Sequence, residues 1–387
     1  MGKKHSEKSD KKNDKNKQQH KNRDKQKNRT APDAKVGDPT GKALKSKPVD
    51  NPSTDSGASD KPATLEKSKA VKKSKTIEAS KSSGKSKQAA EAKNKIKNKA
   101  ARDRAADSRK GRIDKSITNR EFKLLLKPDG LERRKTVAGY QTFMQDFCKQ
   151  QKVEYLPLET AATGLRNVTF YDTPDEDLRG NRVILRVRAS RKDLWVDEWC
   201  EVTLKRRHDD FETAAAFDPK PHFEGDVRTR MRFKEEILRG SDPDQPRSIY
   251  SNNAIINTVP IDRLNTNRIG EIYSIFPGLK ALEISADKNL GKVGGAENTI
   301  LEACLPLGMI TFDDEMVAHC DLGVWFRSAG VPLVAELAYA YHVNPKNRKN
   351  RKAHIKANRF FARLQEALRD HLYEGSTKTA LVYGKPE

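Results

Sequence analysis

Apolar and polar residues alternate with period two along two neighbouring stretches of the chain, as they do along half-buried β-strands. Between residues 183 and 188 one face is apolar and the other is cationic, and between residues 201 and 207 the alternation returns. The polar faces of the two stretches carry Arg186, Arg188, Glu201, Thr203 and Lys205. The pattern predicts two paired strands. The ordinary alternative is that their arginines simply meet water.

Weaker patterns predict the remaining elements. Strands are expected at residues 118–126, 153–157, 167–171, 298–312, 316–326 and 332–341. Residues 228–238 form either a strand or the entry to a helix. Apolar residues at helical spacing predict helices at residues 132–151, 260–276 and 353–372. Residues 376–384 are expected to add a last extended segment.

Antiparallel strands with one polar face can close into a barrel, which removes the sheet edges and turns the polar face inward. We therefore expect an α+β fold in which six to eight strands form an antiparallel β-barrel, or tunnel, flanked by helices. Charged side chains inside such a barrel are costly unless a polyanion and a metal compensate them. This cost is itself a clue to function.

The basic character of the 387-residue chain is concentrated near its N-terminus. Residues 1–110 hold 33 lysines and arginines against 14 acidic residues, whereas the rest of the chain holds 44 against 40. The first aromatic residue is Phe122. A segment so poor in large apolar groups cannot offset the entropy of ordering. We expect a disordered lysine-rich tail over residues 1–112 and a tunnel domain over residues 113–387, including the C-terminal amphipathic helix.

A lysine-rich tail binds polyanions through non-specific electrostatics that depend strongly on salt. Nucleic acid, an anionic membrane surface and polyphosphate are all admissible partners for it. The alternative is a solubilising extension without a dedicated partner. The segment has no aromatic residue that could stack on bases.

The cysteines indicate the compartment. Cys148, Cys200, Cys304 and Cys320 are scattered and form no CxxC pair, which argues for a reducing environment and against a disulfide frame or a structural zinc site. The chain has no apolar run of about 18 residues, so we expect no transmembrane segment. The predicted location is cytoplasmic.

Three short motifs follow one another in the middle of the chain, which reads YDTP at residues 171–174, LRVR at 185–188 and TLK at 203–205. They resemble motifs of the CYTH superfamily, also called triphosphate tunnel metalloenzymes. The first strand of that superfamily reads Glu-x-Glu-x-Lys. Here residues 119–123 read NREFK, with Asn119 in place of the first glutamate. The resemblance covers the chain from residue 113 to the C-terminus.

The resemblance implies a tunnel that binds a chain of phosphates beside Mg²⁺ or Mn²⁺. The metal ligands that it implies are Glu121, Glu336 and Glu236. The phosphate-binding residues that it implies are Lys123, Arg186, Arg188, Lys205 and Arg232. Arginine suits this role because its planar group contacts two phosphate oxygens at once. A register slip of one residue would turn Arg232 outward.

Several positions depart from the family pattern. Asn119 and Ala338 stand where the family carries carboxylates, and Lys234 stands at another acidic position. Residues 299–309 add no basic side chain, although the family often has some there. Fewer carboxylates weaken a divalent-metal site. The sequence therefore favours a site that binds polyphosphate more firmly than it favours catalytic hydrolysis at that site.

The leading hypothesis is a metal-dependent phosphohydrolase that acts on tripolyphosphate or an organic triphosphate. One alternative is a non-catalytic protein that binds polyphosphate or another polyanion. Another is a class IV-type adenylate cyclase, which is a branch of the same superfamily. A further alternative is nucleic-acid binding through the tail alone.

Overall fold

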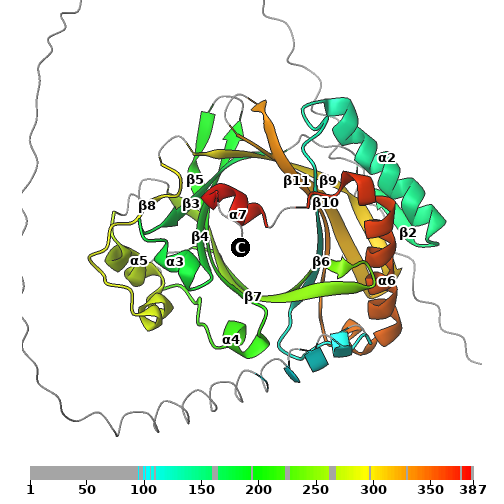
Figure 1. Cartoon of the computed structure of the whole chain (residues 1–387), viewed down its shortest axis with the longest axis horizontal. Coiled ribbons are helices and arrows are strands. Elements are labelled where there is room, and N and C mark those ends of the chain that lie inside the picture. Colours follow the sequence, from blue (N-terminus) through cyan, green and yellow to red (C-terminus); the bar gives the residue numbers. More distant parts are fainter. Residues whose placement is uncertain are drawn as a thin grey trace, which may run out of the picture. The chain divides into compact units, whose positions relative to one another are not determined.

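A computed structural model describes most of the chain after residue 110 (Figure 1). The described ranges are 110–158, 164–192, 195–222, 227–260, 267–295, 298–327, 330–374 and 377–384, with residues 95, 99–100, 102–104 and 106–108 before them. Most of the predicted tail, residues 1–112, lies outside these ranges. None of the helices within them is long and apolar enough to span a membrane.

Nine of the described strands form a closed ring around a central lumen (Figure 1). Around the ring they follow the order β9, β10, β11, β1, β6, β7, β5, β4 and β3, and β3 pairs with β9 to close it. Their bounds are β1 Asn119–Leu126, β3 Gly164–Asp172, β4 Val183–Lys192, β5 Trp195–His208, β6 Thr229–Asp242, β7 Gln245–Pro260, β9 Ile300–Asp313, β10 Met316–Phe326 and β11 Pro332–His342. Two short strands, β2 (Glu154–Pro157) and β8 (Gly291–Lys292), pair with β9 and β3. The predicted α+β fold with a strand tunnel is confirmed.

The ring differs from the expected barrel in strand number and direction. It has nine strands instead of six to eight, and β1 and β6 run parallel, whereas the other neighbours in the ring are antiparallel. Strand directions cannot alternate all the way around a ring with an odd number of members. At least one parallel pair is therefore unavoidable in this ring.

The sequence pattern does not predict β7, which lies between β6 and β5. Its inward positions mix Ile249 and Ile255 with Ser251 and Asn253, so the alternation of apolar and polar residues is lost. The neighbouring β6 is a strand throughout, which decides the ambiguous expectation for residues 228–238.

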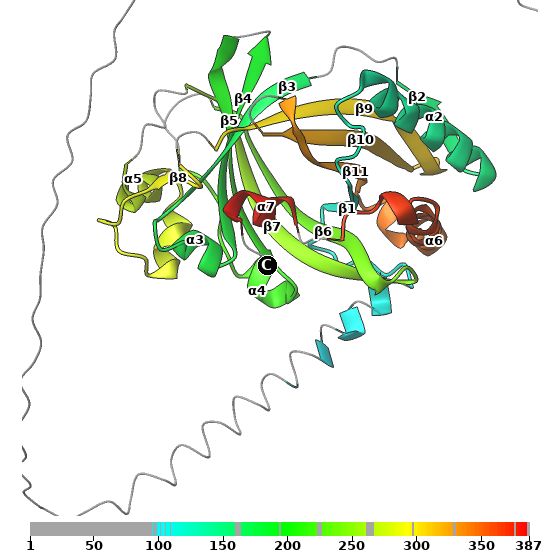
Figure 2. The same ribbon diagram turned by 45° about the horizontal axis from the view of Figure 1, so that its top comes forward.

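Two long helices cover the outer face of one side of the ring (Figure 2). They are α2 (Arg134–Gln150) and α6 (Arg351–Ala367), close to the predicted bounds 132–151 and 353–372. Both helices pack against β9 and join the largest apolar cluster of the protein. Short helical segments elsewhere are α3 Asp177–Gly180, α4 Phe211–Ala215, η4 Asn347–Lys349 and η5 Arg369–His371.

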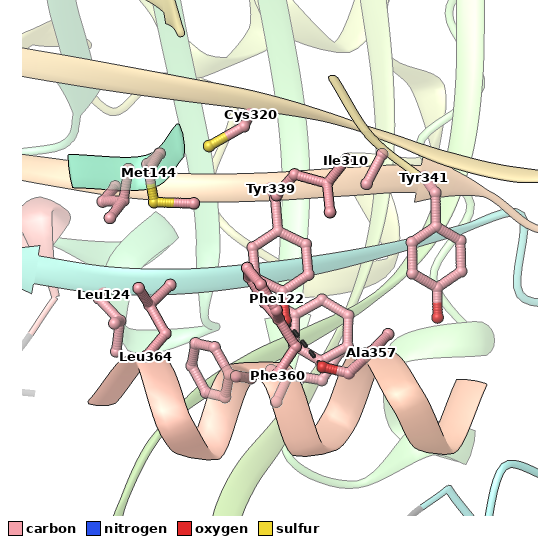
Figure 3. Close-up of a cluster of buried hydrophobic side chains, with 14 of the residues drawn as sticks. Phe122, Leu124, Met144, Ile310, Cys320, Tyr339, Tyr341, Ala357, Phe360 and Leu364 are labelled. Atoms are coloured by element: carbon pink, nitrogen blue, oxygen red, sulfur yellow. Dashed lines mark hydrogen bonds between the residues drawn. The ribbon is translucent and has the colours of Figure 1, made fainter. Parts of the chain in front are cut away.

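Aromatic side chains join this side of the ring to its helices (Figure 3). Phe122 stacks on Tyr339 with their ring centroids 4.6 Å apart. The hydroxyl of Tyr339 donates a hydrogen bond to the backbone oxygen of Ala357 on α6 at 2.9 Å. Because Phe122 is buried outward, the alternate residues Glu121 and Lys123 face the lumen.

The opposite side of the ring is covered by α5 (Ile269–Ile275) and η2 (Pro277–Leu282). They pack on the apolar outer faces of β4, β5 and β7, which include Val183, Leu185 and Val187. The helix predicted over residues 260–276 is therefore shorter than expected. Part of that range, residues 261–266, lies outside the described residues.

Part of the lumen wall is apolar, and the C-terminal helix α7 (Lys378–Tyr383) packs against it. The cluster includes Phe170, Trp325 and Val382. The expected extended segment at residues 376–384 is thus wrong. Thr377 caps the helix by accepting a hydrogen bond from the backbone N–H of Ala380, and Gly384 ends it with a φ of +68°.

The packed part of the chain begins before residue 113. The hydroxyl of Ser108 accepts a hydrogen bond from Arg120 Nη2 at 2.9 Å, and Asn358 Nδ2 donates to the backbone oxygen of Ser108 at 3.0 Å. The guanidinium of Arg104 lies over the Phe211 ring, 4.0 Å from its centroid. Polar and cation–π contacts therefore dock a segment that has no apolar face.

Candidate functional site

The lumen contains a cavity of about 620 Å³, which is large enough for a small anionic ligand. Among the described residues, eleven lysines and arginines and four glutamates line it. The sequence-predicted site residues that line it are Glu121, Lys123, Arg186, Arg188, Lys205, Arg232 and Glu336. Glu236, the remaining predicted residue, is fully buried in the wall. The fold thus brings seven of the eight predicted residues to one cavity and places Glu236 in its wall.

The β4–β5 hairpin supplies the arginines. Arg186 lies opposite Thr203 and Arg188 opposite Glu201, so the polar faces of both strands point into the lumen. The two arginine side chains are only 20% and 16% exposed. Both arginines are therefore largely shielded from bulk water, contrary to the alternative that they only face solvent.

Glu236 accepts hydrogen bonds from three cationic side chains. Lys205 Nζ and Ser251 Oγ donate to Oε1, the latter at 2.8 Å. Lys123 Nζ and Arg207 Nη2 donate to Oε2 at 3.3 Å and 2.7 Å. We call this group the lysine cluster. It joins four neighbouring strands, β1, β6, β7 and β5.

A second buried carboxylate, Glu302 on β9, holds another group of cations. Its Oε2 accepts a hydrogen bond from Arg166 Nε at 2.5 Å and lies 3.4 Å from Arg188 Nε. Its Oε1 accepts from Trp325 Nε1 at 2.9 Å and lies 3.8 Å from Lys378 Nζ. We call this group the arginine cluster. Its residues come from β3, β4, β9, β10 and α7.

Two of the glutamates that line the cavity, Glu121 and Glu336, also have lysine partners. Glu121 Oε2 accepts a hydrogen bond from Lys234 Nζ at 3.0 Å and lies 3.1 Å from Lys123 Nζ. Glu336 Oε1 lies 3.0 Å from Lys378 Nζ. Lys234 is the basic residue found at an acidic position of the family pattern. It neutralises the glutamate that remains in the first motif.

Some polar atoms of the cavity have no partner among the described residues. They are Nε of Arg186 and Oδ1 of Asn253, and both are buried. Buried polar groups are normally hydrogen-bonded, so unsatisfied ones require an explanation. The unpaired Nε–H adds to the cost of holding the Arg186 cation in the wall, because this atom has almost no surface open to the cavity.

Two cations of the cavity have lowered pKa values, and burial is the main cause. Burial, together with the neighbouring Arg188, lowers the pKa of Arg186 to about 9. Burial, together with nearby Arg207, Lys123 and Lys234, lowers the pKa of Lys205 to about 7, although Glu236 opposes the shift. A bound polyanion would stabilise the charged forms of both groups.

The carboxylates show the opposite shift, which predicts a loss of stability in acid. Burial alone would raise the pKa of Glu302, but Arg188, Lys378 and Arg166 outweigh it and lower the pKa. A carboxyl with a lower pKa in the folded state stabilises the fold above its unfolded value of 4.5, and this contribution is lost as the pH falls.

We therefore expect the free energy of unfolding, measured by urea titration, to fall as the pH drops below 4.5, the ordinary value for glutamate. Glu302→Gln should make this dependence on pH shallower. An equal slope in the variant and the unaltered chain would contradict the role of this carboxyl.

The sequence analysis missed several cations and several carboxylates of the cavity region. Arg207 was within reach, because it continues the alternation of Lys205 on β5. Lys234 lies two residues after Arg232 on β6, so both side chains point to the same side of the strand. Glu302 and Lys378 gave no local signal, since the first lies in an apolar stretch and the second on a short C-terminal helix.

Only part of the predicted metal site fits a divalent cation. The described residues include no group of three or more His, Cys, Asp or Glu side chains that could hold a metal. Mg²⁺ is, however, often bound through one or two carboxylates plus the phosphates of a substrate. Glu121 and Glu336 have lowered pKa values despite burial, because Lys123 and Lys378 respectively lie nearby, so both are ionised. Each offers ionised oxygens that a cation held largely by phosphate could use, but the strand register places Glu336 four residues from Ala340, the partner of Glu121.

A closed ring of strands around a cation-lined lumen defines a tunnel fold. The sequence itself matches no family model and no curated protein.

Several solved structures have a similar fold. One is the putative adenylyl cyclase HpAC1 from Hippeastrum, described as having a dominant triphosphatase activity. It is 13% identical over 70% of this chain and 98% of that one, with a TM-score of 0.35. A putative adenylate cyclase from Bacillus halodurans is 11% identical over 68% and 98%, with a TM-score of 0.31. The S. pombe Pct1 RNA triphosphatase is 13% identical over 67% and 77%, with a TM-score of 0.22. These similarities concern the fold alone.

Proposed function

We propose that the tunnel binds a linear chain of phosphates and hydrolyses a phosphoric anhydride bond in it with the help of Mg²⁺ or Mn²⁺. The ligand is tripolyphosphate or the triphosphate group of an organic molecule. The observation that carries the proposal is the excess of cations over carboxylates along the cavity, where most of the cationic side chains are half-buried. Such an excess is costly without a compensating polyanion.

Lys123, Arg186, Arg188, Lys205 and Arg232 are the proposed phosphate ligands. The arginines offer forked donors that contact two phosphate oxygens at once, whereas the lysines act as compact charges. Arg186 and Arg188 both face the cavity from β4. Together these side chains would orient the phosphate chain along the lumen and replace its water of hydration.

Glu121 and Glu336 would hold the metal together with phosphate oxygens. When bound, a divalent cation polarises the scissile phosphoryl group and lowers the pKa of a bound water. The predicted role of Glu236 as a third ligand is less favoured by its contacts, since both of its oxygens already accept hydrogen bonds.

A second candidate function is the binding of polyphosphate without turnover. It is favoured by the lysine partners of Glu121 and Glu336, which compete with any cation for the same oxygens. The cytoplasmic location and the binding of nucleic acid, anionic surfaces or polyphosphate by the basic tail stay predictions from the sequence.

A substrate panel with the metal varied tests the proposal. Tripolyphosphate, ATP and other organic triphosphates are offered with Mg²⁺, Mn²⁺ or EDTA, and orthophosphate release is measured. Glu121→Gln is expected to lower the rate by about 100-fold, because a metal contributes several kcal/mol to such a reaction. Glu366→Gln on the outer surface of α6 should leave the rate unchanged.

The same panel separates the alternatives. If tripolyphosphate binds but no orthophosphate appears with either metal, the protein is a binder and the proposed hydrolysis is wrong. Release of cyclic AMP and pyrophosphate from ATP would instead identify a cyclase.

A further inference from the structure

The two buried carboxylates Glu236 and Glu302 have the same arrangement on opposite sides of the ring. Each is almost fully buried, and each has four donors or cationic groups around its two oxygens. An ionised carboxylate offers about four lone-pair positions. On Glu236 all four are used by Lys205, Ser251, Lys123 and Arg207. No position is left on this carboxylate for a metal ion.

The partners of the two carboxylates divide the ring between them. Glu236 joins β1, β6, β7 and β5, which follow one another in the ring. Glu302 joins the next arc, which consists of β4, β3, β9 and β10. Each carboxylate therefore fixes cations from several strands at once, and the two arcs contain all of the ring except β11.

Five of the cations held in this way line the cavity. Lys123, Lys205 and Arg207 of the lysine cluster line it, as do Arg188 and Lys378 of the arginine cluster. A long cationic side chain loses much rotamer freedom when a ligand immobilises it. A carboxylate behind the cation immobilises it in advance, so less entropy is lost on binding.

We propose that Glu236 and Glu302 are positioning residues that aim the lysine cluster and the arginine cluster at two adjacent parts of one phosphate chain, without ligating a metal. This inference rests on the proposed function, because it concerns the same ligand. It assigns Glu302 a role that the sequence did not suggest. It also gives Glu236 a role that competes with the predicted one as a metal ligand.

Glutamate-to-aspartate variants test the proposal without changing the charge of the lumen. Glu236→Asp and Glu302→Asp keep one negative charge but withdraw it by one methylene from the cations. Tripolyphosphate binding to the full chain is measured by calorimetry in EDTA, so that no metal contributes. We expect each variant to bind about tenfold more weakly, the effect of weakening one hydrogen bond to a charged group. Glu366→Asp on the surface of α6 is the matched control and should bind like the unaltered chain.

Double variants show whether the effect passes through the cations. In a Lys205→Gln background, Glu236→Asp should have a much smaller effect on affinity than it has alone, because the residues act as a unit. Arg188→Gln should reduce the effect of Glu302→Asp in the same way. Effects that simply add in both pairs would overturn the positioning role. Ser251→Ala leaves every charge in place and should weaken binding by a smaller factor than Glu236→Asp. It provides the test of the positioning role of Glu236 if Glu236→Asp does not fold.

The possible results separate the two proposals. If the unaltered chain binds tripolyphosphate neither in EDTA nor in the presence of Mg²⁺ or Mn²⁺, the proposed function fails. If it binds in EDTA while both aspartate variants bind equally well, only the positioning role fails. If binding requires Mg²⁺ and Glu236→Asp raises the Mg²⁺ concentration needed for it, Glu236 is a metal ligand and its positioning role fails.

Discussion

Replacing Arg186 and Arg188 together by alanine is expected to weaken tripolyphosphate binding by at least about 100-fold, since each charge-assisted hydrogen bond contributes about 1.5–3 kcal/mol. Both guanidiniums lie on β4, face the cavity and are mostly shielded from bulk water. In such a site, donors aimed at an anion act with little competition from solvent. Alanine removes these donors and two of the positive charges that attract the ligand.

Calorimetry with tripolyphosphate measures this effect. A matched control is Arg359→Ala/Arg363→Ala, which removes the same charge from exposed positions of α6 outside the ring. Loss of net charge alone would weaken binding equally in both double variants. If Arg186→Ala/Arg188→Ala binds as tightly as the control, the tunnel is not the binding site, and the basic tail becomes the remaining candidate.

The largest effect on stability is expected for Arg120→Ala, at about 3–5 kcal/mol, the typical cost of removing one partner of a buried ion pair. Arg120 is completely buried, and its Nε donates to Glu235 Oε2 at 2.8 Å. Its other nitrogens donate to Tyr341 Oη at 3.0 Å and to Ser108 Oγ at 2.9 Å. Alanine leaves the Glu235 carboxylate buried without its cation.

Urea unfolding at neutral pH measures the loss of stability. Arg363→Ala breaks an exposed pair with Glu366 on α6 and should cost less than about 0.5 kcal/mol. A loss below about 1 kcal/mol for Arg120→Ala would mean that water or another cation compensates Glu235. Since Arg120 also holds Ser108, the segment before residue 113 should become more sensitive to proteolysis in this variant.

The local pattern predicted the site residues wherever one strand shows a strict alternation. Arg186 and Arg188 share a face because successive side chains of a strand point to opposite sides, and this holds whatever the rest of the chain does. The same rule would have found Arg207 two residues after Lys205. It could not find β7, whose inward face carries Ile249 beside Ser251 and Asn253.

The contacts of the buried carboxylates were beyond local patterns. Glu302 meets Arg166, which lies 136 positions away in the chain, and Lys378, which comes from a helix where an extended segment was expected. Glu236 meets Lys123 only because β1 lies beside β6 as a parallel neighbour. These distances depend on how the ring closes, and ring closure is set by the pairing of strands that are remote in sequence.

By itself, the sequence determined which side chains of each strand lie together, because the two-residue period of a strand is a local property of the backbone. It also indicated that a basic polar face required an anion. Only the tertiary structure decided that this face encloses a lumen, since that depends on β3 pairing with β9. It likewise decided which carboxylates are left for a ligand and which are already held by lysine and arginine, because those contacts form between strands that meet only in the closed ring.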